Sequence, residues 1–285
     1  MNQVRTFASF DSSFDKADYI LTGIPYDKTS SFRTGTDRGP EHIRKASYCF
    51  EPYLMEYDIS IDQIDLHDAG DLSGFEDFEE LRVDIRETLS DIVKKDKFPI
   101  TLGGEHSISP PIVSSIQKIF PELEVIILDA HLDFRDEYGG KKHSHATVSR
   151  RISEIVGIEN ITVIGTRSLS EGFTEKKKPT YFTSKQVRER DCIEKILMEI
   201  NEPIYLSIDM DVADPSLVPG VGNPEPFGLS SVEVKEFVSR LSPDLVGMDI
   251  VETNPKYDVS DVTSNLAARL VYELIGSREK RDLGK

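Results

Sequence analysis

Short apolar runs separated by amphipathic segments recur along the whole chain. Six runs predict β-strands, at residues 19–25, 98–104, 123–130, 160–166, 203–210 and 244–252. They are rich in β-branched residues and mostly unbroken, which is typical of strands that are covered on both faces. The segments between or beside them predict helices, at residues 39–47, 76–95, 107–120, 144–156, 231–241 and 264–280. This alternation predicts an α/β protein with a mainly parallel central sheet between layers of helices.

Composition and charge narrow the class of protein. No linker, repeat or shift in composition divides the 285 residues, so we expect one domain over residues 1–285. No apolar stretch approaches the roughly 18–20 residues that cross a membrane, and the N-terminus lacks the apolar core of a secretory signal. The two cysteines form no CxxC motif and suit the reducing cytoplasm. A net charge of −17 without a basic stripe argues against a nucleic-acid partner.

Acidic and imidazole side chains gather where four predicted strands end. Ligands of open parallel sheets bind beyond the carboxyl ends of the strands, so side chains at these ends meet in one place. The run 125–128 is followed by three such residues at every second position, which puts them on one side of an extended chain. The residues at the four strand ends are His106, Asp129, His131, Asp133, Asp209, Asp211 and Glu252.

Two imidazoles and four carboxylates in this set predict a metal site. Buried together without a cation, they would repel one another at a cost of several kcal/mol. Oxygen-rich ligands with some nitrogen suit a hard or borderline divalent ion such as Mn²⁺, and the lack of thiolate argues against a structural zinc. Six ligands exceed the needs of one ion with an open position, so we expect two ions bridged by carboxylate. Such a pair lowers the pKa of a water molecule held between the ions.

Three motifs carry a resemblance to a known family. The stretches GGEH, DAHLDFRD and SIDMDVADP resemble the signature motifs of the ureohydrolases, which include arginase, agmatinase and their relatives. The similarity extends from GIPYDKTSSFRTGTDRGPEHIRKAS near the N-terminus to VETNP near the C-terminus. The resemblance implies a three-layer α-β-α sandwich, the arginase-like fold, as a single ureohydrolase domain with a binuclear manganese centre.

The resemblance also implies a role for each site residue. One ion would be held by His106, Asp129, Asp133 and Asp209, and the other by Asp129, His131, Asp209 and Asp211. A hydroxide bridging the two ions would attack the central carbon of a guanidinium group, with Asp133 counted among the catalytic residues. Glu252 would pair with the guanidinium fork, since a carboxylate accepts two parallel N–H bonds. His145, for which Ser144 would be the N-cap, would protonate the leaving amine.

Several residues beside these motifs receive only supporting roles. We expect Asp214 to stabilise a turn through an Asx-type hydrogen bond, and His143 to lie in an entrance loop. Glu105 and Asp249 flank the ligands without matching ligand positions, and His42 and His67 match no catalytic position. Phe227 stands where glycine is more usual in the family.

Three functions compete. A deacetylase-like zinc amidohydrolase would keep one metal and lack His106 as a ligand, and a non-catalytic relative would have lost a ligand, His145 or Glu252. The intact set favours an enzyme that converts a guanidino compound to urea and an amine. The loop RDEYGG…SHATVSRR resembles the agmatinase branch, so we expect agmatine as substrate, with arginine, aminopropylagmatine and guanidinobutyrate as alternatives. Arg135 would bind a carboxylate of the substrate or pair with a neighbouring acid such as Asp136 or Glu137. The family further suggests a homo-oligomer, a trimer or hexamer.

Overall fold

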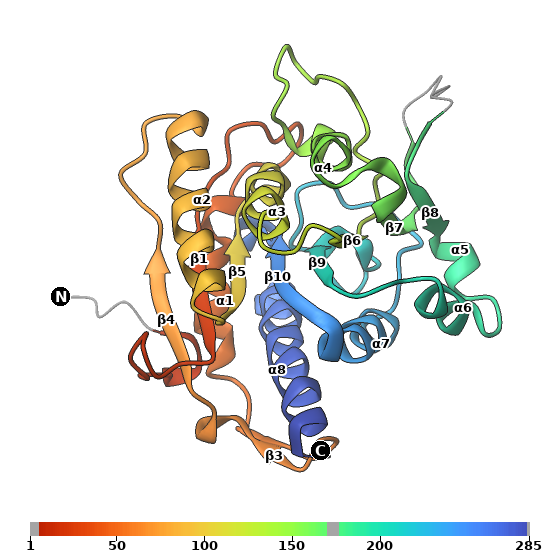
Figure 1. The fold of residues 1–285 in the computed structure, drawn as a ribbon. Coiled ribbons are helices and arrows are strands. Elements are labelled where there is room, and N and C mark those ends of the chain that lie inside the picture. Colours follow the sequence, from red (N-terminus) through yellow and green to blue (C-terminus); the bar gives the residue numbers. More distant parts are fainter. Residues whose placement is uncertain (1–5, 170–176, 284–285) are drawn as a thin grey trace.

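The computed structural model describes residues 6–169 and 177–283 and is built on an eight-stranded sheet (Figure 1). Every strand pair in this sheet is parallel. The strands, in spatial order, are β4 (Leu66–Asp71), β1 (Tyr19–Ile24), β5 (Phe98–Gly103), β10 (Leu245–Val251), β9 (Ile204–Asp209), β6 (Glu124–Leu128), β7 (Ile161–Thr166) and β8 (Thr180–Thr183). A short antiparallel pair, β2 (Tyr53–Leu54) and β3 (Ile59–Ser60), lies apart from it.

All six predicted strands are present, whereas the two edge strands escaped prediction. β4 has the sequence LHDAGD, and only its first residue is fully buried. β8 has four residues, none of them fully buried. Strands at the edge of a sheet lose the continuous apolar run that marks central parallel strands. The hydrophobic pattern therefore predicts the centre of this sheet and misses its rims.

Helices cover both faces of the sheet. On one face lie α2 (Phe78–Lys94), α3 (Ser109–Gln117) and α4 (Val148–Val156), which contact one another in this order. On the other face lie α1 (Gly39–Ser47), α7 (Ser231–Leu241) and α8 (Val262–Leu283), both α1 and α7 packing against α8 (Figure 1). Two short helices, α5 (Ser184–Val187) and α6 (Cys192–Met198), follow β8 and were not predicted. The predicted three-layer α-β-α arrangement is confirmed.

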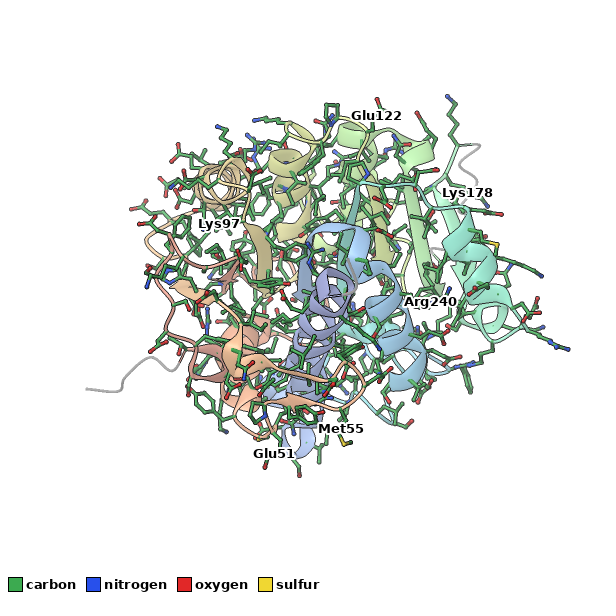
Figure 2. The ribbon with its side chains drawn as sticks, turned by 60° about the horizontal axis from the view of Figure 1, so that its bottom comes forward. Glu51, Met55, Lys97, Glu122, Lys178 and Arg240 are labelled. Atoms are coloured by element: carbon green, nitrogen blue, oxygen red, sulfur yellow. The ribbon has the colours of Figure 1, made fainter. Side chains whose placement is uncertain are left out.

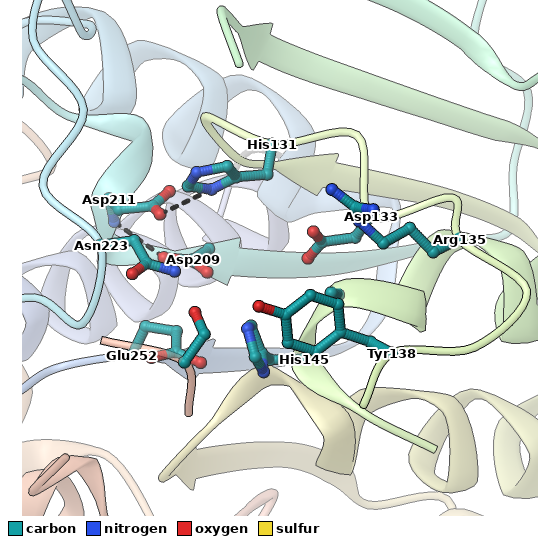
Figure 3. A pocket seen from close by; sticks show the side chains of 11 residues that line it. His131, Asp133, Arg135, Tyr138, His145, Asp209, Asp211, Asn223 and Glu252 are labelled. Atoms are coloured by element: carbon teal, nitrogen blue, oxygen red, sulfur yellow. Dashed lines mark hydrogen bonds and ion pairs between the residues drawn. The ribbon is translucent and has the colours of Figure 1, made fainter. Parts of the chain in front are cut away.

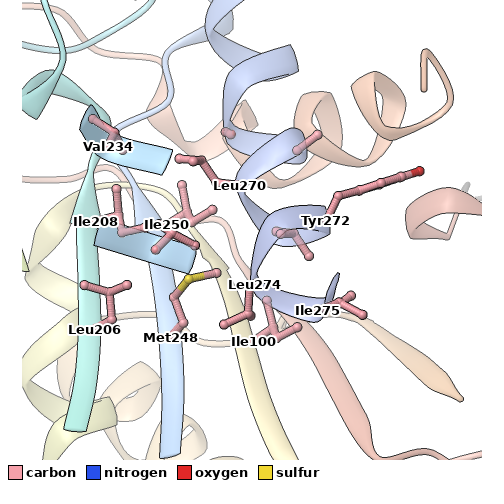
Figure 4. Close-up of a cluster of buried hydrophobic side chains, with 14 of the residues drawn as sticks. Ile100, Leu206, Ile208, Val234, Met248, Ile250, Leu270, Tyr272, Leu274 and Ile275 are labelled. Atoms are coloured by element: carbon pink, nitrogen blue, oxygen red, sulfur yellow. The ribbon is translucent and has the colours of Figure 1, made fainter. Parts of the chain in front are cut away.

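The alternation of side chains along the strands divides the core into two layers. In β6, Val125 and Ile127 pack with α2, α3 and α4, while Ile126 and Leu128 pack with the α7 and α8 side. The second layer joins side chains of β5, β10, β9 and α8, among them Met248 (Figure 4). Because a fully buried Leu or Ile contributes about 1.5–3 kcal/mol, these two layers hold the strand ends firmly in place.

The strand order brings the four site-bearing strands together at the centre. β5, β10, β9 and β6 are consecutive in space, although β10 is the last strand in the chain. Glu252 N–H donates to the Gly104 carbonyl at 2.8 Å, which links the end of β10 to the end of β5. In the register, Val251 lies opposite Asp209. The ends of these strands are therefore level at one edge of the sheet.

The outside of the molecule is charged. Glu122, Lys178 and Arg240, from separate parts of the chain, project outward around the periphery (Figure 2). Among the described residues, no helix has the length and apolarity required to cross a membrane.

Candidate metal centre

The structure brings the six predicted ligands together at the edge formed by β5, β9 and β6. Ligand atoms of His106, Asp129 and Asp209 lie within 4.8 Å of one another, and so do those of Asp129, His131 and Asp211. Asp129 belongs to both groups. The sixth residue, Asp133, lies beside the first group. The chain thus has two adjoining clusters, each able to hold a metal ion.

The first cluster surrounds the Nδ1 atom of His106. This nitrogen is 3.2 Å from Asp129 Oδ2, 3.4 Å from Asp209 Oδ2 and 3.9 Å from Asp133 Oδ2. His106 itself is fully buried. Asp133 has a backbone φ of +46°, in the left-handed region that non-glycine residues rarely adopt. Such a conformation costs about 1–3 kcal/mol and is typical of functional sites, where surrounding contacts enforce it.

The second cluster surrounds the Nδ1 atom of His131. It lies 3.0 Å from Asp211 Oδ2 and 3.5 Å from Asp129 Oδ1. On the other side of the ring, Nε2 is 3.5 Å from Glu225 Oε1. His131 therefore presents one nitrogen to the cluster and the other to a carboxylate outside it, as metal-binding histidines commonly do.

A chain of hydrogen bonds orients His106 toward its cluster. Nε2 lies 3.0 Å from Ser207 Oγ, and that hydroxyl donates to Asp249 Oδ1 at 2.7 Å. Tyr205 donates its hydroxyl to the other oxygen of Asp249 at 2.6 Å. Because Ser207 gives its proton to Asp249, it can only accept from Nε2, so Nε2 carries a proton and Nδ1 is the nitrogen available to a cation. The supporting role expected of Asp249 is consistent with this arrangement.

The donor set fits a metal ion. His106 Nδ1 is buried and makes no hydrogen bond, although it faces three carboxylates. A divalent cation would use this lone pair and neutralise the carboxylates, all of which are oxygen donors suited to hard or borderline ions. This part of the chain therefore forms a candidate metal centre built of nitrogen and oxygen ligands.

The protonation of the cluster reflects the crowding of charge. Burial, with the negative charge of Asp129, raises the pKa of Asp133 to about 8. Burial also raises the pKa values of Asp209 and Glu252 well above the usual range for carboxyl groups. Burial acts against the ionised form of Asp129 too, but the neighbouring His106 and His131 rings outweigh it and lower the pKa of that group. Without a cation, the cluster therefore retains protons.

A cavity of about 130 Å³ opens over the cluster, and Figure 3 shows its lining. Glu252, which is 8% exposed and has a φ of +63°, lies in its wall. Its Oε1 accepts a hydrogen bond from His106 N–H at 2.9 Å. A Cβ atom on Gly222 would come within 2.9 Å of its Oε2, so a side chain there would displace this carboxylate oxygen. The remaining lining includes Ser31, His131, Asp133, Arg135, Tyr138, His145, Ala146, Asp209, Asp211 and Asn223.

His145 lies in the same wall and opens a short 3-10 turn that leads into α4. Ser144 accepts a hydrogen bond from Ala146 N–H, so its predicted capping role is confirmed. The His145 ring meets the Tyr138 ring edge-on, with 5.4 Å between centroids. Burial, helped by positive charge on His131 and His106, lowers the pKa of His145 to about 4. Its imidazole is therefore neutral at neutral pH.

Arg135 lines the cavity without pairing with its acidic neighbours. Asp136 pairs instead with Arg151, at 3.1 Å. The Arg135 guanidinium lies 5.5 Å from the centroid of Tyr138. Among the described residues Arg135 forms no ion pair, so of its two alternative roles the pairing with Asp136 or Glu137 is not observed.

The remaining sequence candidates have structural surroundings. His143 stacks on Phe78, with 5.3 Å between ring centroids, and does not line the cavity over the cluster. Asp214 Oδ1 accepts from Ser216 N–H at 3.0 Å, which confirms the expected turn. Further contacts are those of His42 with Asp261 at 3.7 Å and of His67 Nδ1 with Ser12 O at 2.8 Å. Phe227 is 80% exposed, has a φ of +68° and is absent from the cavity lining.

Sequence reasoning missed four polar residues around the cavity, namely Thr29, Ser31, Tyr138 and Asn223. Ser31 and Thr29 belong to the loop after β1, which is rich in serine and threonine. This loop follows the carboxyl end of a parallel strand, and that position alone would have identified it as a candidate wall of the site.

Comparisons with known proteins agree with this geometry. A sequence profile described as the Arginase family matches residues 17–276. The agmatinase of Pyrococcus horikoshii is 36% identical, over 95% of this chain and 97% of the relative. The N(1)-aminopropylagmatine ureohydrolase of Thermococcus kodakarensis is 34% identical, over 93% of this chain and 92% of the relative. The crystal structure of agmatine ureohydrolase from Thermoplasma volcanium superposes with a TM-score of 0.93 at 38% identity, covering 100% of this chain and 97% of that one.

A parallel α/β sandwich with an imidazole–carboxylate cluster at the carboxyl edge of its central strands defines the class of protein. The chain belongs to the arginase family. The resemblance seen in the three motifs is thereby confirmed.

Proposed function

We propose that this protein is a binuclear manganese ureohydrolase that converts agmatine and water to putrescine and urea. The observation that carries the proposal is the meeting of two adjoining ligand clusters, Glu252 and His145 around one cavity. The similarity to proteins named agmatinase, over almost the full length of both chains, supports the choice of substrate.

We propose that His106, Asp129, Asp133 and Asp209 hold one ion, and that Asp129, His131, Asp209 and Asp211 hold the other. When bound, the ions would supply Lewis-acid activation of a water molecule at neutral pH. The chain itself supplies the orientation of the ligands. Ser207 and Asp249 direct His106, and Glu225 lies against the outer nitrogen of His131.

Glu252 is the group proposed to bind the guanidinium. One of its oxygens is occupied by the His106 N–H, which fixes the carboxylate in the wall of the cavity. Burial raises its pKa, so a neighbouring cation favours the ionised form that it needs to bind. A guanidinium donates N–H bonds in a fixed fork, and pairing with this carboxylate would orient the central carbon toward the clusters.

His145 is the group proposed to move the proton. The leaving amine must gain a proton when the C–N bond breaks. The neutral imidazole of His145 would first take up a proton released by the attacking water and then deliver it to that amine. His145 contributes no ligand atom to either cluster, so its proposed role is separate from metal binding.

A panel of substrates tests the proposal. Protein loaded with Mn²⁺ is assayed for urea release from agmatine, aminopropylagmatine, arginine and guanidinobutyrate. We expect the highest kcat/KM with agmatine, and no release after removal of the metal by a chelator. A kcat/KM for arginine equal to or above that for agmatine contradicts the assignment.

Aminopropylagmatine is the second candidate substrate, because a second cavity adjoins the first. This cavity, of about 110 Å³, shares His131, Asp133 and Arg135 with the first and extends to Ser168 and Leu169. A substrate with a longer amine tail would have room to extend into it. A higher kcat/KM for aminopropylagmatine than for agmatine in the same panel identifies this alternative.

The homo-oligomer implied by the family stays a prediction. Sedimentation velocity of the purified protein tests for a trimer or hexamer of the 32.1 kDa chain.

A further inference from the structure

A buried carboxylate, Glu105, is connected to His145 by hydrogen bonds through the loop after β1. Glu105 is fully buried and follows the end of β5. One of its oxygens accepts from the N–H groups of Lys28 and Thr29, at 2.7 and 2.5 Å. The other accepts from the hydroxyls of Thr29 and Ser107, at 2.7 and 2.5 Å. Four donors thus converge on this carboxylate and hold residues 28 and 29 against the end of β5.

The Thr29 hydroxyl connects this carboxylate to His145. Its oxygen accepts from the His145 backbone N–H at 3.1 Å and lies 3.2 Å from His145 Nδ1. A hydroxyl has one proton to donate and two lone pairs to accept with. The contact with Glu105 is the shortest of the three and involves an acceptor, so the proton of Thr29 is used there. The Thr29 oxygen can therefore meet Nδ1 only as an acceptor.

We propose that Thr29, fixed by Glu105, is a positioning residue that holds the proton of His145 on Nδ1 and leaves Nε2 as the nitrogen that exchanges a proton in the cavity. The inference deepens the proposed function, because it matters for turnover only if His145 is the proton donor. It assigns a task to the buried Glu105, which is not a member of either metal-binding cluster.

Ser144 offers a competing arrangement. Its Oγ is 3.3 Å from the same Nδ1. If that hydroxyl donated to Nδ1, the ring proton would belong on Nε2. Ser144 Oγ already accepts from Ala146 N–H as a helix cap. The two arrangements predict opposite tautomers of His145, so they can be distinguished directly.

The first measurement is independent of activity. Long-range ¹H–¹⁵N spectra are recorded on the full chain loaded with diamagnetic Zn²⁺, and the His145→Asn spectrum identifies the signals of the ring. We expect the Nδ1–H tautomer in the unaltered protein and in Thr29→Ser, which keeps the hydroxyl. Thr29→Val removes it at nearly constant volume and should shift the ring toward the Nε2–H tautomer.

The second measurement follows turnover of the Mn²⁺-loaded protein. Thr29→Val should lower kcat by about 10-fold, a part of the 10²–10⁴-fold typical of general acid–base catalysis. KM and metal content should remain unchanged, and Thr29→Ser should restore most of the rate. A general structural defect would instead change metal content and KM together.

The proposal is overturned by an Nε2–H tautomer in the unaltered protein, or by a Thr29→Val variant with unchanged tautomer and kcat. If Thr29→Val does not fold, Thr29→Ala takes its place in both measurements. The tautomer of His145 in the unaltered protein tests the proposal without any variant. If no guanidino compound yields urea, the proposed function fails, while the tautomer measurement still tests the position of the proton.

Discussion

At the scale of single residues, the site combines groups that need opposite surroundings. His106 and His131 must each direct an Nδ1 lone pair at a cation. Ser207 and Glu225 lie against the opposite ring nitrogen, Nε2, and orient the two rings. His145 lies in the same wall as a neutral imidazole, because burial lowers its pKa to about 4. Separate polar partners for each ring let three histidines differ in function within one cavity.

His145→Asn should separate catalysis from metal binding. We expect two metal ions per chain as in the unaltered protein and a kcat lowered by about 10²–10⁴-fold, because the variant loses a proton donor but no ligand. Elemental analysis and urea release measure the two effects. Loss of manganese in this variant would show that His145 is a ligand instead.

Asp129→Asn, unlike His145→Asn, should reduce metal binding. Asp129 belongs to both clusters, so replacing its carboxylate by a neutral amide weakens both sites at once. We expect metal content to fall and turnover to be lost, as also for Asp209→Asn. Asp214→Asn is the matched control, since Asp214 only caps a turn, and it should keep its metal. Full metal content in Asp129→Asn would contradict the assignment of a bridging ligand.

At the scale of elements, the site depends on the loop after β1 packing closely on the end of β5. Gly104 makes this possible, because a Cβ atom there would lie 2.2 Å from the carbonyl oxygen of Tyr26. Gly104 comes directly before Glu105 and His106 in the chain, so the backbone position of both depends on this close contact. The glycine in the GGEH motif therefore has a steric reason that is separate from the metal.

Gly104→Ala should destabilise the fold and the site together. The clash is with backbone atoms that cannot rotate away, so we expect a loss of more than about 2 kcal/mol in the free energy of unfolding. Gly74→Ala is the control, because Gly74 has a φ of +93° but a Cβ added to it would meet no atom within 4 Å. It should cost only about 1–2 kcal/mol, the strain of the left-handed region. Urea-induced unfolding of both variants measures the difference, and equal losses would refute the steric explanation.

At the scale of the whole molecule, proton binding and metal binding compete in the cluster. Asp133, with a pKa raised by burial to about 8, keeps a proton in the folded metal-free protein at pH values where an unfolded chain has lost it. The stability that this proton contributes is lost as the pH rises from about 4 toward 8. Burial would lower the pKa of His131, but the negative charge of Asp211 outweighs it and the pKa is raised. Above about pH 6.5 this group therefore also makes the metal-free protein less stable as the pH rises.

The stabilisation by Mn²⁺ should therefore increase with pH. We expect the metal-free protein to lose stability between pH 5 and pH 8, and the metal-loaded protein to lose less. Each proton displaced by the metal should add about 1.4 kcal/mol of metal-dependent stabilisation per pH unit. Thermal unfolding with and without Mn²⁺ at several pH values measures this, and a metal-induced rise in Tm that is greatest at pH 5 would contradict it.

The sequence by itself determined the three layers, the six central strands and the residues that meet at their ends. Apolar periodicity specifies buried strands, and residues just after such strands reach the same edge of a parallel sheet. Only the tertiary structure decided that β10, last in the chain, inserts between β5 and β9, which brings Glu252 beside His106. It alone revealed the edge strands, whose apolar pattern is weak, and the contact of Thr29 with His145, which are 116 residues apart. Local sequence records which face of an element is buried, whereas the pairing of distant loops depends on packing of the whole chain.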